Sequence, residues 1–269
     1  MQPQLLIEAP PELASVRARF ESTDRNQLAG IAELVGLVEP GPAIRVVLAP
    51  ESSDLAKQFA PWIAGFARGA AGEIVIFPSR SPTYPHNSLQ DVLRHEVAHV
   101  LIARAADGEA VPRWFNEGLA MAAERSWGFE DQTRLLYQLV LGPTAGLDEI
   151  DRLFAGSRRN QDRAYALAGA FVRDVIRQYG HTVPARVLGG VRSGAPFEAA
   201  FADAAGVTLG QAESDFWQKQ RIWTTWLPIV TSSATVWMIV TIIALLAIRR
   251  RRQKDAEMQR KWDEEESEL

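Results

Sequence analysis

The stretch His95-Glu96-Val97-Ala98-His99 brings together the residue types of a hydrolytic metal site. Residues four apart lie on the same face of an α-helix, so His95 and His99 can bind one metal ion. Glu96 follows the first histidine and could take a proton from a water that the metal activates. The pattern is rare by chance, because the 269 residues include only four histidines. The alternative is a helix with two polar histidines and no metal.

The residues around this motif predict the helix that it needs. Ser88 is followed three residues later by Asp91, which is typical of a capping box at a helix N-terminus. Apolar residues then recur at helical spacing. We therefore expect a helix from about Leu89 to Ala105. Its apolar side must be buried, because an isolated helix of this length is only marginally stable.

A third ligand is needed, because catalytic zinc usually has three protein ligands and one open position. The next candidate is Glu117, which lies 18 residues after His99. Pro112 suits the first turn of a second helix. A helix that returns from there would bring the carboxylate of Glu117 beside the two imidazoles.

The first motif and the later stretch Trp114-Phe115-Asn116-Glu117-Gly118-Leu119-Ala120 together resemble the gluzincin branch of zinc metallopeptidases. They are most similar to peptidase-MA-like bacterial proteins, and the similarity extends over residues 43–217. The resemblance implies a zincin-like fold and one zinc ion per chain, bound by His95, His99 and Glu117. It also implies that Glu96 is the general base of peptide hydrolysis.

Two further positions matter for this resemblance. Thermolysin-like relatives have an aspartate four residues after the ligand glutamate, where it orients the first histidine. Met121 stands at that position here, so another group orients His95 or the site is tuned differently. Many gluzincins also use a tyrosine or histidine to stabilise the oxyanion, and Tyr165 is the candidate. The alternative for Tyr165 is a core residue that packs beside Phe171.

The other two histidines, His86 and His181, lack metal-ligand spacing and are expected in loops or at helix ends. Residues 43–49 and 73–77 are predicted strands. Zincins commonly place an edge strand above the metal helix, where an extended substrate can add by backbone pairing. We expect residues 73–77 to be that strand, although it could also simply cover the core.

After the metal helices, the pattern predicts helices at residues 131–141, 147–155, 161–179, 183–192, 196–205 and 208–223. The predicted fold class is α+β, with a small mixed sheet, a mostly helical body and one C-terminal transmembrane helix. The predicted domains are a zincin-like metallopeptidase domain at 1–225, a transmembrane helix at 226–248 and a charged cytoplasmic tail at 249–269.

The transmembrane prediction rests on Trp226 to Ile248, 23 residues without a charge. Four arginines follow at 249–252, so the positive-inside rule predicts a single-pass protein with a cytoplasmic C-terminus and an extracytoplasmic catalytic domain. A buried soluble helix is the alternative. Residues 1–30 show no signal peptide. We interpret the chain as a mature or truncated form that has lost one; otherwise the span itself drives export, or the orientation is reversed.

Composition limits the partners and the ligands. The net charge of −4 argues against nucleic acid. Cysteine is absent, so a zinc site must use histidine and carboxylate. The expected partners are a peptide or protein substrate and the lipid bilayer, and the oligomeric state is not indicated.

Three hypotheses for function remain. The first is a membrane-anchored zinc metallopeptidase, and the second is a zinc-dependent hydrolase of a non-peptide substrate. The third is a catalytically idle zincin-fold binding protein, against which the presence of Glu96 argues.

Overall fold

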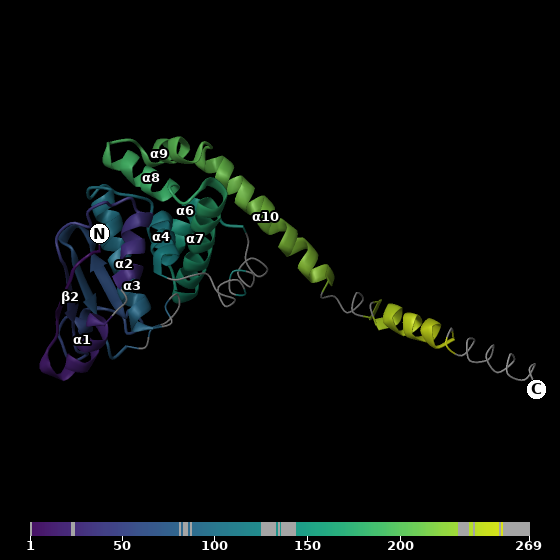
Figure 1. Cartoon of the computed structure of the whole chain (residues 1–269), viewed down its shortest axis with the longest axis horizontal. Coiled ribbons are helices and arrows are strands. Elements are labelled where there is room, and N and C mark those ends of the chain that lie inside the picture. Colours follow the sequence, from purple (N-terminus) through teal and green to yellow (C-terminus); the bar gives the residue numbers. More distant parts are fainter. Residues whose placement is uncertain are drawn as a thin grey trace, which may run out of the picture. The chain divides into compact units, whose positions relative to one another are not determined.

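The computed structural model describes residues 2–22, 25–80, 82, 86, 88–124, 133, 135, 144–230, 237–238, 240–252 and 254. The chain divides into two compact units, Met1–Gln218 and Lys219–Leu269. The first unit holds a four-stranded sheet and the helices that surround and follow it (Figure 1). Every residue that the sequence assigned to a catalytic site belongs to this first unit.

The sheet is mixed, as the sequence predicted. Its strands lie in the order β1 (Leu5–Glu8), β2 (Ile44–Leu48), β4 (Glu73–Ile76) and β3 (Gly65–Arg68). The strands β1, β2 and β4 are parallel, and β3 runs antiparallel to β4. Side chains of β2 alternate between the core and the surface, so one face of the sheet is buried.

The strand at the edge of the sheet differs from the one that the sequence predicted. The strands expected at 43–49 and 73–77 are confirmed as β2 and β4, but β4 is not at the edge, because it pairs with β2 on one side and β3 on the other. The edge position next to β4 belongs to β3, which the sequence analysis did not predict. Its residues, Gly65-Phe66-Ala67-Arg68, include no β-branched side chain.

A row of alternating charges crosses the exposed face of the sheet. Arg45 on β2 pairs with Glu8 on β1 at 2.8 Å and with Glu73 on β4 at 2.7 Å. Arg68 on β3 pairs with Glu73 at 2.8 Å. Each of these ion pairs at the surface adds only about 0.2–1 kcal/mol to the free energy of unfolding. The alternation still favours this strand order, because exchanging neighbouring strands would place like charges opposite each other.

The rest of the first unit is mostly helical, in agreement with the predicted α+β class. The helices are α1 (Ala14–Glu21), α2 (Arg25–Leu34), α3 (Leu89–Ala105), α4 (Arg113–Glu124), α6 (Leu147–Leu153), α7 (Arg158–Tyr179), α8 (Val183–Arg192), α9 (Phe197–Ala205) and the start of α10 (Leu209–Val230). Short 3-10 turns are η1 (Pro11–Leu13), η2 (Ala56–Gln58) and η3 (Gly69–Ala71). The predicted helix at 131–141 lies mostly outside the described residues.

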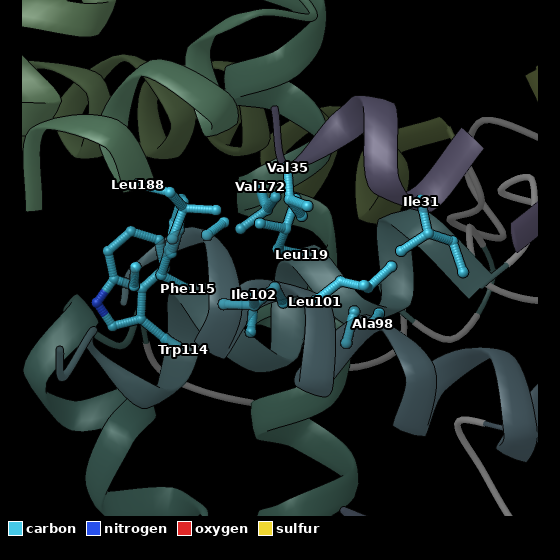
Figure 2. Packing of buried hydrophobic residues seen from close by; sticks show 14 of the residues in the cluster. Ile31, Val35, Ala98, Leu101, Ile102, Trp114, Phe115, Leu119, Val172 and Leu188 are labelled. Carbon is cyan, nitrogen blue, oxygen red and sulfur yellow. The ribbon is translucent and has the colours of Figure 1, made fainter. Parts of the chain in front are cut away.

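The helix α3 occupies the centre of this unit and has the predicted bounds. Ser88 caps it, because its Oγ accepts a hydrogen bond from the backbone N–H of Asp91 at 3.1 Å. One side of α3 contacts β3 and β4, and the other contacts α4. Figure 2 shows apolar side chains of α2, α3, α4, α7 and α8 packed together in this region. The site residues therefore rest on a single continuous core.

The close packing of α4 against α7 depends on Gly118. A Cβ atom at this position would lie 2.5 Å from the carbonyl oxygen of Ala168 and 2.6 Å from Cγ2 of Val172. Backbone cannot yield as a flexible side chain can, so a larger residue would push the two helices apart. Gly118 directly follows Glu117, and its small size therefore sets how deeply the start of α4 is buried.

The predicted transmembrane helix at 226–248 is wrong. In the part of the chain that the structure describes, no helix combines the length and the apolar character needed to cross a membrane. Residues 226–230 belong to α10, which begins at Leu209 and carries charges such as Asp215 and Lys219. Residues 231–236 and 239 lie outside the described residues. The predictions of a single-pass membrane protein, of an extracytoplasmic catalytic domain and of a cytoplasmic C-terminus rested on that helix and are withdrawn with it.

A pair of glycine substitutions tests the packing at Gly118. We expect Gly118→Ala to lower the free energy of unfolding by about 1–3 kcal/mol through overpacking. Gly189→Ala is the matched control, because Gly189 lies within α8 with open space where its Cβ would be. That control is expected to be neutral or to stabilise by about 0.5–1 kcal/mol. Urea unfolding followed by tryptophan fluorescence measures both, and equal effects would contradict the packing argument.

Candidate metal centre and active site

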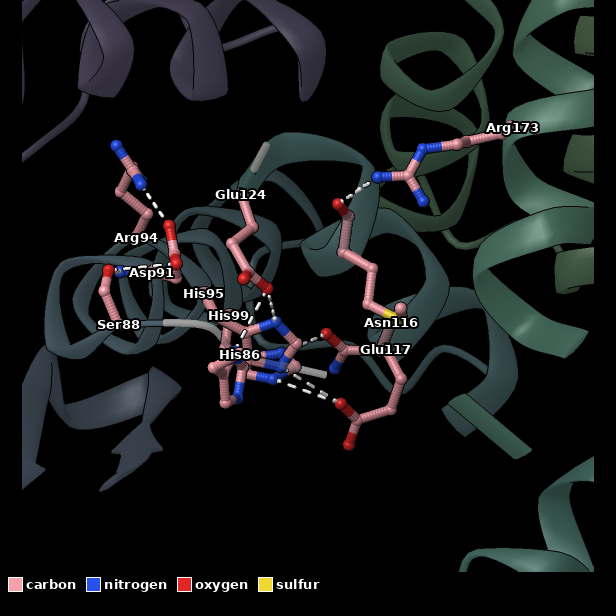
Figure 3. A network of polar contacts seen from close by, with 11 residues as sticks. His86, Ser88, Asp91, Arg94, His95, His99, Asn116, Glu117, Glu124 and Arg173 are labelled. Carbon is pink, nitrogen blue, oxygen red and sulfur yellow. Dashed lines mark hydrogen bonds and ion pairs between the residues drawn. The ribbon is translucent and has the colours of Figure 1, made fainter. Parts of the chain in front are cut away.

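Two histidines of α3 and one glutamate of α4 converge at the contact between these helices. His95 Nε2 and His99 Nε2 each lie 3.4 Å from Oε2 of Glu117. One ligand atom from each of the three residues lies within 4.8 Å of the other two. Figure 3 shows the imidazoles gathered beside Glu117. The structure thus brings together the three residues that the sequence singled out as metal ligands.

The arrangement fits a metal ion. Glu117 Oε2 is buried and has no hydrogen-bond partner among the described residues, although it faces both imidazoles. Zinc bonds of about 2.0–2.1 Å in a tetrahedral site place the ligand atoms about 3.3–3.4 Å apart. The two distances to Glu117 agree with that spacing. Two imidazoles and one carboxylate are also a common protein ligand set of catalytic zinc.

The second nitrogen of each imidazole also has an acceptor on α4. His99 Nδ1 lies within hydrogen-bond distance of Asn116 Oδ1, at 2.7 Å, whereas His95 Nδ1 faces Glu124 Oε2 at 3.3 Å in an ion-pair contact without hydrogen-bond geometry. An Nδ1–H that donates to such an acceptor leaves Nε2 free for a metal and sets the direction of the ring. Both imidazoles are therefore oriented with Nε2 toward Glu117.

Glu124 is the functional residue that sequence reasoning missed. Thermolysin-like spacing points to Met121, four residues after Glu117, whereas the carboxylate that faces His95 is seven residues after it. Met121 instead packs near Gly169 of α7. The available signal was a single charged residue, seven positions from Glu117, at the end of the apolar run Ala120-Met121-Ala122-Ala123.

His86 extends this network from the segment that precedes α3. Its Nδ1 lies 3.1 Å from Oε2 of Glu124, and its ring centre lies 4.6 Å from that of His95. His86 lies outside any helix or strand, as expected, but its contact with Glu124 was not predicted. His86, His95 and Glu124 form a second group with metal-ligand spacing. Because one oxygen of Glu124 serves both imidazoles, we interpret this group as a network that orients His95.

The mutual burial of these groups shifts their pKa values. Burial alone would lower the pKa of His95, but Glu117 and Glu124 raise it to about 10. Burial likewise opposes the charged form of His99, and Glu117 overcomes it, so the pKa of His99 is also raised. The pKa of Glu117 is lowered, because both histidines outweigh the effect of its burial. A metal ion must therefore displace protons from the imidazoles when it binds.

Glu96 and Tyr165 line the same cavity as the three candidate ligands, and this cavity has a volume of about 610 Å³. The ring centre of Tyr165 lies 6.4 Å from that of His95 and 5.1 Å from that of Phe154. Burial, together with the charges of Glu117 and Glu96, raises the pKa of Tyr165 well above its ordinary value. Its hydroxyl therefore stays protonated at neutral pH and can act as a hydrogen-bond donor.

The edge strand β3 forms one wall of this cavity. Gly65, Phe66 and Ala67 all line it, and the half-exposed Trp62 lies just before them. A Cβ atom on Gly65 would lie 2.8 Å from Val92, and one on Gly69 would lie 2.8 Å from Ala103. These glycines let β3 and the following turn approach α3 closely.

The buried Arg80 holds the segment that leads into β3. Its guanidinium donates hydrogen bonds to the carbonyl oxygens of Ala60 and Ile63, both at 2.9 Å. It also binds both carboxylate oxygens of Glu51, at 2.8 and 3.0 Å. Arg80 thereby fixes the backbone on either side of Trp62, at the rim of the cavity.

A small mixed sheet over a histidine-bearing helix, with a carboxylate from the next helix, is the arrangement expected of a zincin-like domain. Residues 58–222, more than half of the chain, match the model of the Peptidase MA superfamily. The chain therefore belongs to the Peptidase MA superfamily. A search among curated proteins found no match.

The role of Glu124 can be tested without a substrate. Removing its charge should let the His95 ring turn, so we expect Glu124→Gln to weaken zinc binding by about 10- to 100-fold. Glu109→Gln is the control, since Glu109 is exposed and does not line the cavity. Competition with a chromophoric chelator measures the affinity, and circular dichroism checks folding. A folded Glu124→Gln variant with unchanged affinity would show that Glu124 does not orient the ligand.

Proposed function

We propose that this chain is a zinc metallopeptidase of the gluzincin type. His95, His99 and Glu117 bind one zinc ion per chain, and Glu96 is the general base. The observation that carries the proposal is the convergence of His95 Nε2 and His99 Nε2 on the buried Oε2 of Glu117, which has no hydrogen-bond partner among the described residues, in the cavity that Glu96 also lines. The catalytic domain is proposed to span residues 1–225.

The chemistry divides between the metal and the side chains. Zinc at this site would lower the pKa of a water molecule and polarise the substrate carbonyl. Glu96 accepts the proton of the attacking water and returns it to the leaving amine. Tyr165, whose raised pKa keeps its hydroxyl protonated, donates a hydrogen bond to the developing oxyanion.

The substrate is proposed to be an extended peptide. β3 is the last strand of the described sheet on its side, so its outer edge is available for backbone pairing. Residues of this strand line the cavity that contains Glu96. Membership of a peptidase superfamily favours peptide hydrolysis over hydrolysis of another substrate. The presence of Glu96 in the cavity supports catalysis over an idle binding role.

Two substitutions separate metal binding from proton transfer. We expect the purified wild type to bind about one zinc per chain and Glu117→Ala to lose most of it. Glu96→Gln should keep its zinc, because Glu96 is not a ligand, yet cleave peptides at least about 100-fold more slowly. Elemental analysis and a library of quenched fluorescent peptides provide the two measurements. Full zinc content in Glu117→Ala, or undiminished cleavage by Glu96→Gln, would contradict the respective assignment.

Tyr165 is tested by removing only its hydroxyl. Loss of an oxyanion donor lowers kcat by about 100-fold or more, so Tyr165→Phe should reduce kcat with little change in KM. Tyr179→Phe is the control on the same helix, because the Tyr179 hydroxyl contacts Asp215 and does not line the cavity. Unchanged kcat in Tyr165→Phe would leave Tyr165 as a core residue.

A further inference from the structure

We propose that the active-site cavity selects substrates with a carboxylate close to the scissile bond, and that Arg113 and Arg158 bind this carboxylate. The inference rests on the proposed peptidase function and names the substrate class of the same site. Both arginines line the cavity that contains Glu96, Glu117 and Tyr165.

The two arginines occupy equivalent places on their helices. Arg113 is the first residue of α4, four residues before Glu117, and Arg158 is the first residue of α7, seven residues before Tyr165. Those spacings put each arginine on the same helix face as the later residue. At 1.5 Å per residue, the arginines lie about 6 and 10 Å along the helix axes from those residues. A substrate strand covers such a length with about two or three residues.

Arg113 is held in place while its charge stays available. Its guanidinium carbon lies 4.9 Å from the ring centre of Phe154, a buried residue, which favours one position of the arginine side chain. Its Nε forms an ion pair with Oε1 of Glu117 at 3.6 Å, a distance too long for a hydrogen bond, so this contact leaves the N–H groups of the guanidinium without a hydrogen bond to Glu117. Half of the side chain is exposed. Its remaining N–H groups can therefore bind a ligand in the cavity.

Arg158 is exposed, and no other described residue forms an ion pair or hydrogen bond with its side chain. Such a group normally stays fully solvated. At the cavity wall, however, it can meet a bound substrate, and guanidinium groups bind carboxylates through two parallel hydrogen bonds. The guanidinium of Arg158 can therefore form an ion pair with a carboxylate of the substrate.

The balance of charge in the cavity also favours an anionic substrate. A divalent ion would offset the carboxylates of Glu96 and Glu117, and Asp162 is the one further carboxylate among the described lining residues. Asp162 can offset only one of the two arginines. The lining residues of the loaded cavity thus keep one unmatched positive charge, at the arginines, while Glu124 lies behind His95 and does not line the cavity. A carboxylate of the substrate can come from an acidic side chain or from a free C-terminus.

Matched peptides test this preference. The parent peptide is one that the zinc-loaded full chain cleaves. In its variants, glutamate, glutamine or lysine replaces one residue at a time, at the three positions on each side of the scissile bond. A second set compares free and amidated C-termini. We expect kcat/KM to be about tenfold higher with the favourably placed carboxylate, as for one charge-assisted contact. The preference should shrink as salt concentration rises.

Variants connect the preference to the two arginines. Arg158→Gln should lose most of the preference for the peptide with the carboxylate, and Arg158→Glu should favour the lysine peptide. Arg159→Gln is the matched control, because it removes the same charge one residue away, from an exposed side chain that does not line the cavity. The substitution Arg113→Gln, added to Arg158→Gln, should remove any preference that remains.

The outcomes distinguish this inference from the function on which it rests. Preference for an internal glutamate or for a free C-terminus would each support it and would identify the source of the carboxylate. Cleavage with equal kcat/KM for glutamate and glutamine peptides, or equal effects of Arg158→Gln and Arg159→Gln, would overturn this inference alone. No cleavage of any peptide by the zinc-loaded chain would overturn the proposed peptidase function and this inference with it.

Discussion

The mutual burial of His95, His99 and Glu117 is the constraint on which the rest of the structure depends. Removing two imidazoles and a carboxylate from water costs several kcal/mol unless opposite charges or a metal compensate for it. Here the compensation is local, because both Nε2 atoms lie 3.4 Å from the same carboxylate oxygen. Such short distances require α3 and α4 to lie close together in one register. The apolar contacts around them maintain that register.

Close approach on both sides of the site is achieved through glycine. On one side, Gly118 lets α4 rest against the backbone of α7, which also carries Tyr165. On the other, Gly65 and Gly69 let the edge strand and its following turn rest against α3. The elements on both sides of the cavity are therefore closely packed, and close-packed contacts deform little. A reaction that needs several groups placed around one carbonyl benefits from such rigid walls.

The parts of the structure that local sequence determines were predictable. The bounds of α3, its cap at Ser88 and the return of Glu117 on the next helix all follow from spacing within 30 residues. The strand β3 was not predictable in this way, because its short segment Gly65–Arg68 depends on pairing with β4. The charge-free run at 226–248 led to the wrong prediction of a transmembrane helix, because the run was judged apart from the residues that precede it. Its composition suits a membrane helix, but its first residues continue a helix that begins among charged residues at Leu209.

The position of the orienting carboxylate at 124 in place of 121 is compatible with the geometry of α4. At 3.6 residues per turn, the seventh residue after Glu117 lies about 20° from it around the helix, whereas the fourth lies about 40° away on the other side. Met121 faces Gly169 of α7, and Glu124 faces α3.

Glu117 and Glu124 hold His95 from opposite sides, although seven residues, or about 10 Å along the helix axis, separate them. Their Oε2 atoms nevertheless reach opposite nitrogens of one imidazole, at 3.4 and 3.3 Å, so His95 is held from both sides. Asn116 of the same helix meets the second nitrogen of His99. Thus α3 supplies both imidazoles, and α4 supplies the side chains that their nitrogens face, with His86 joining the network at Glu124.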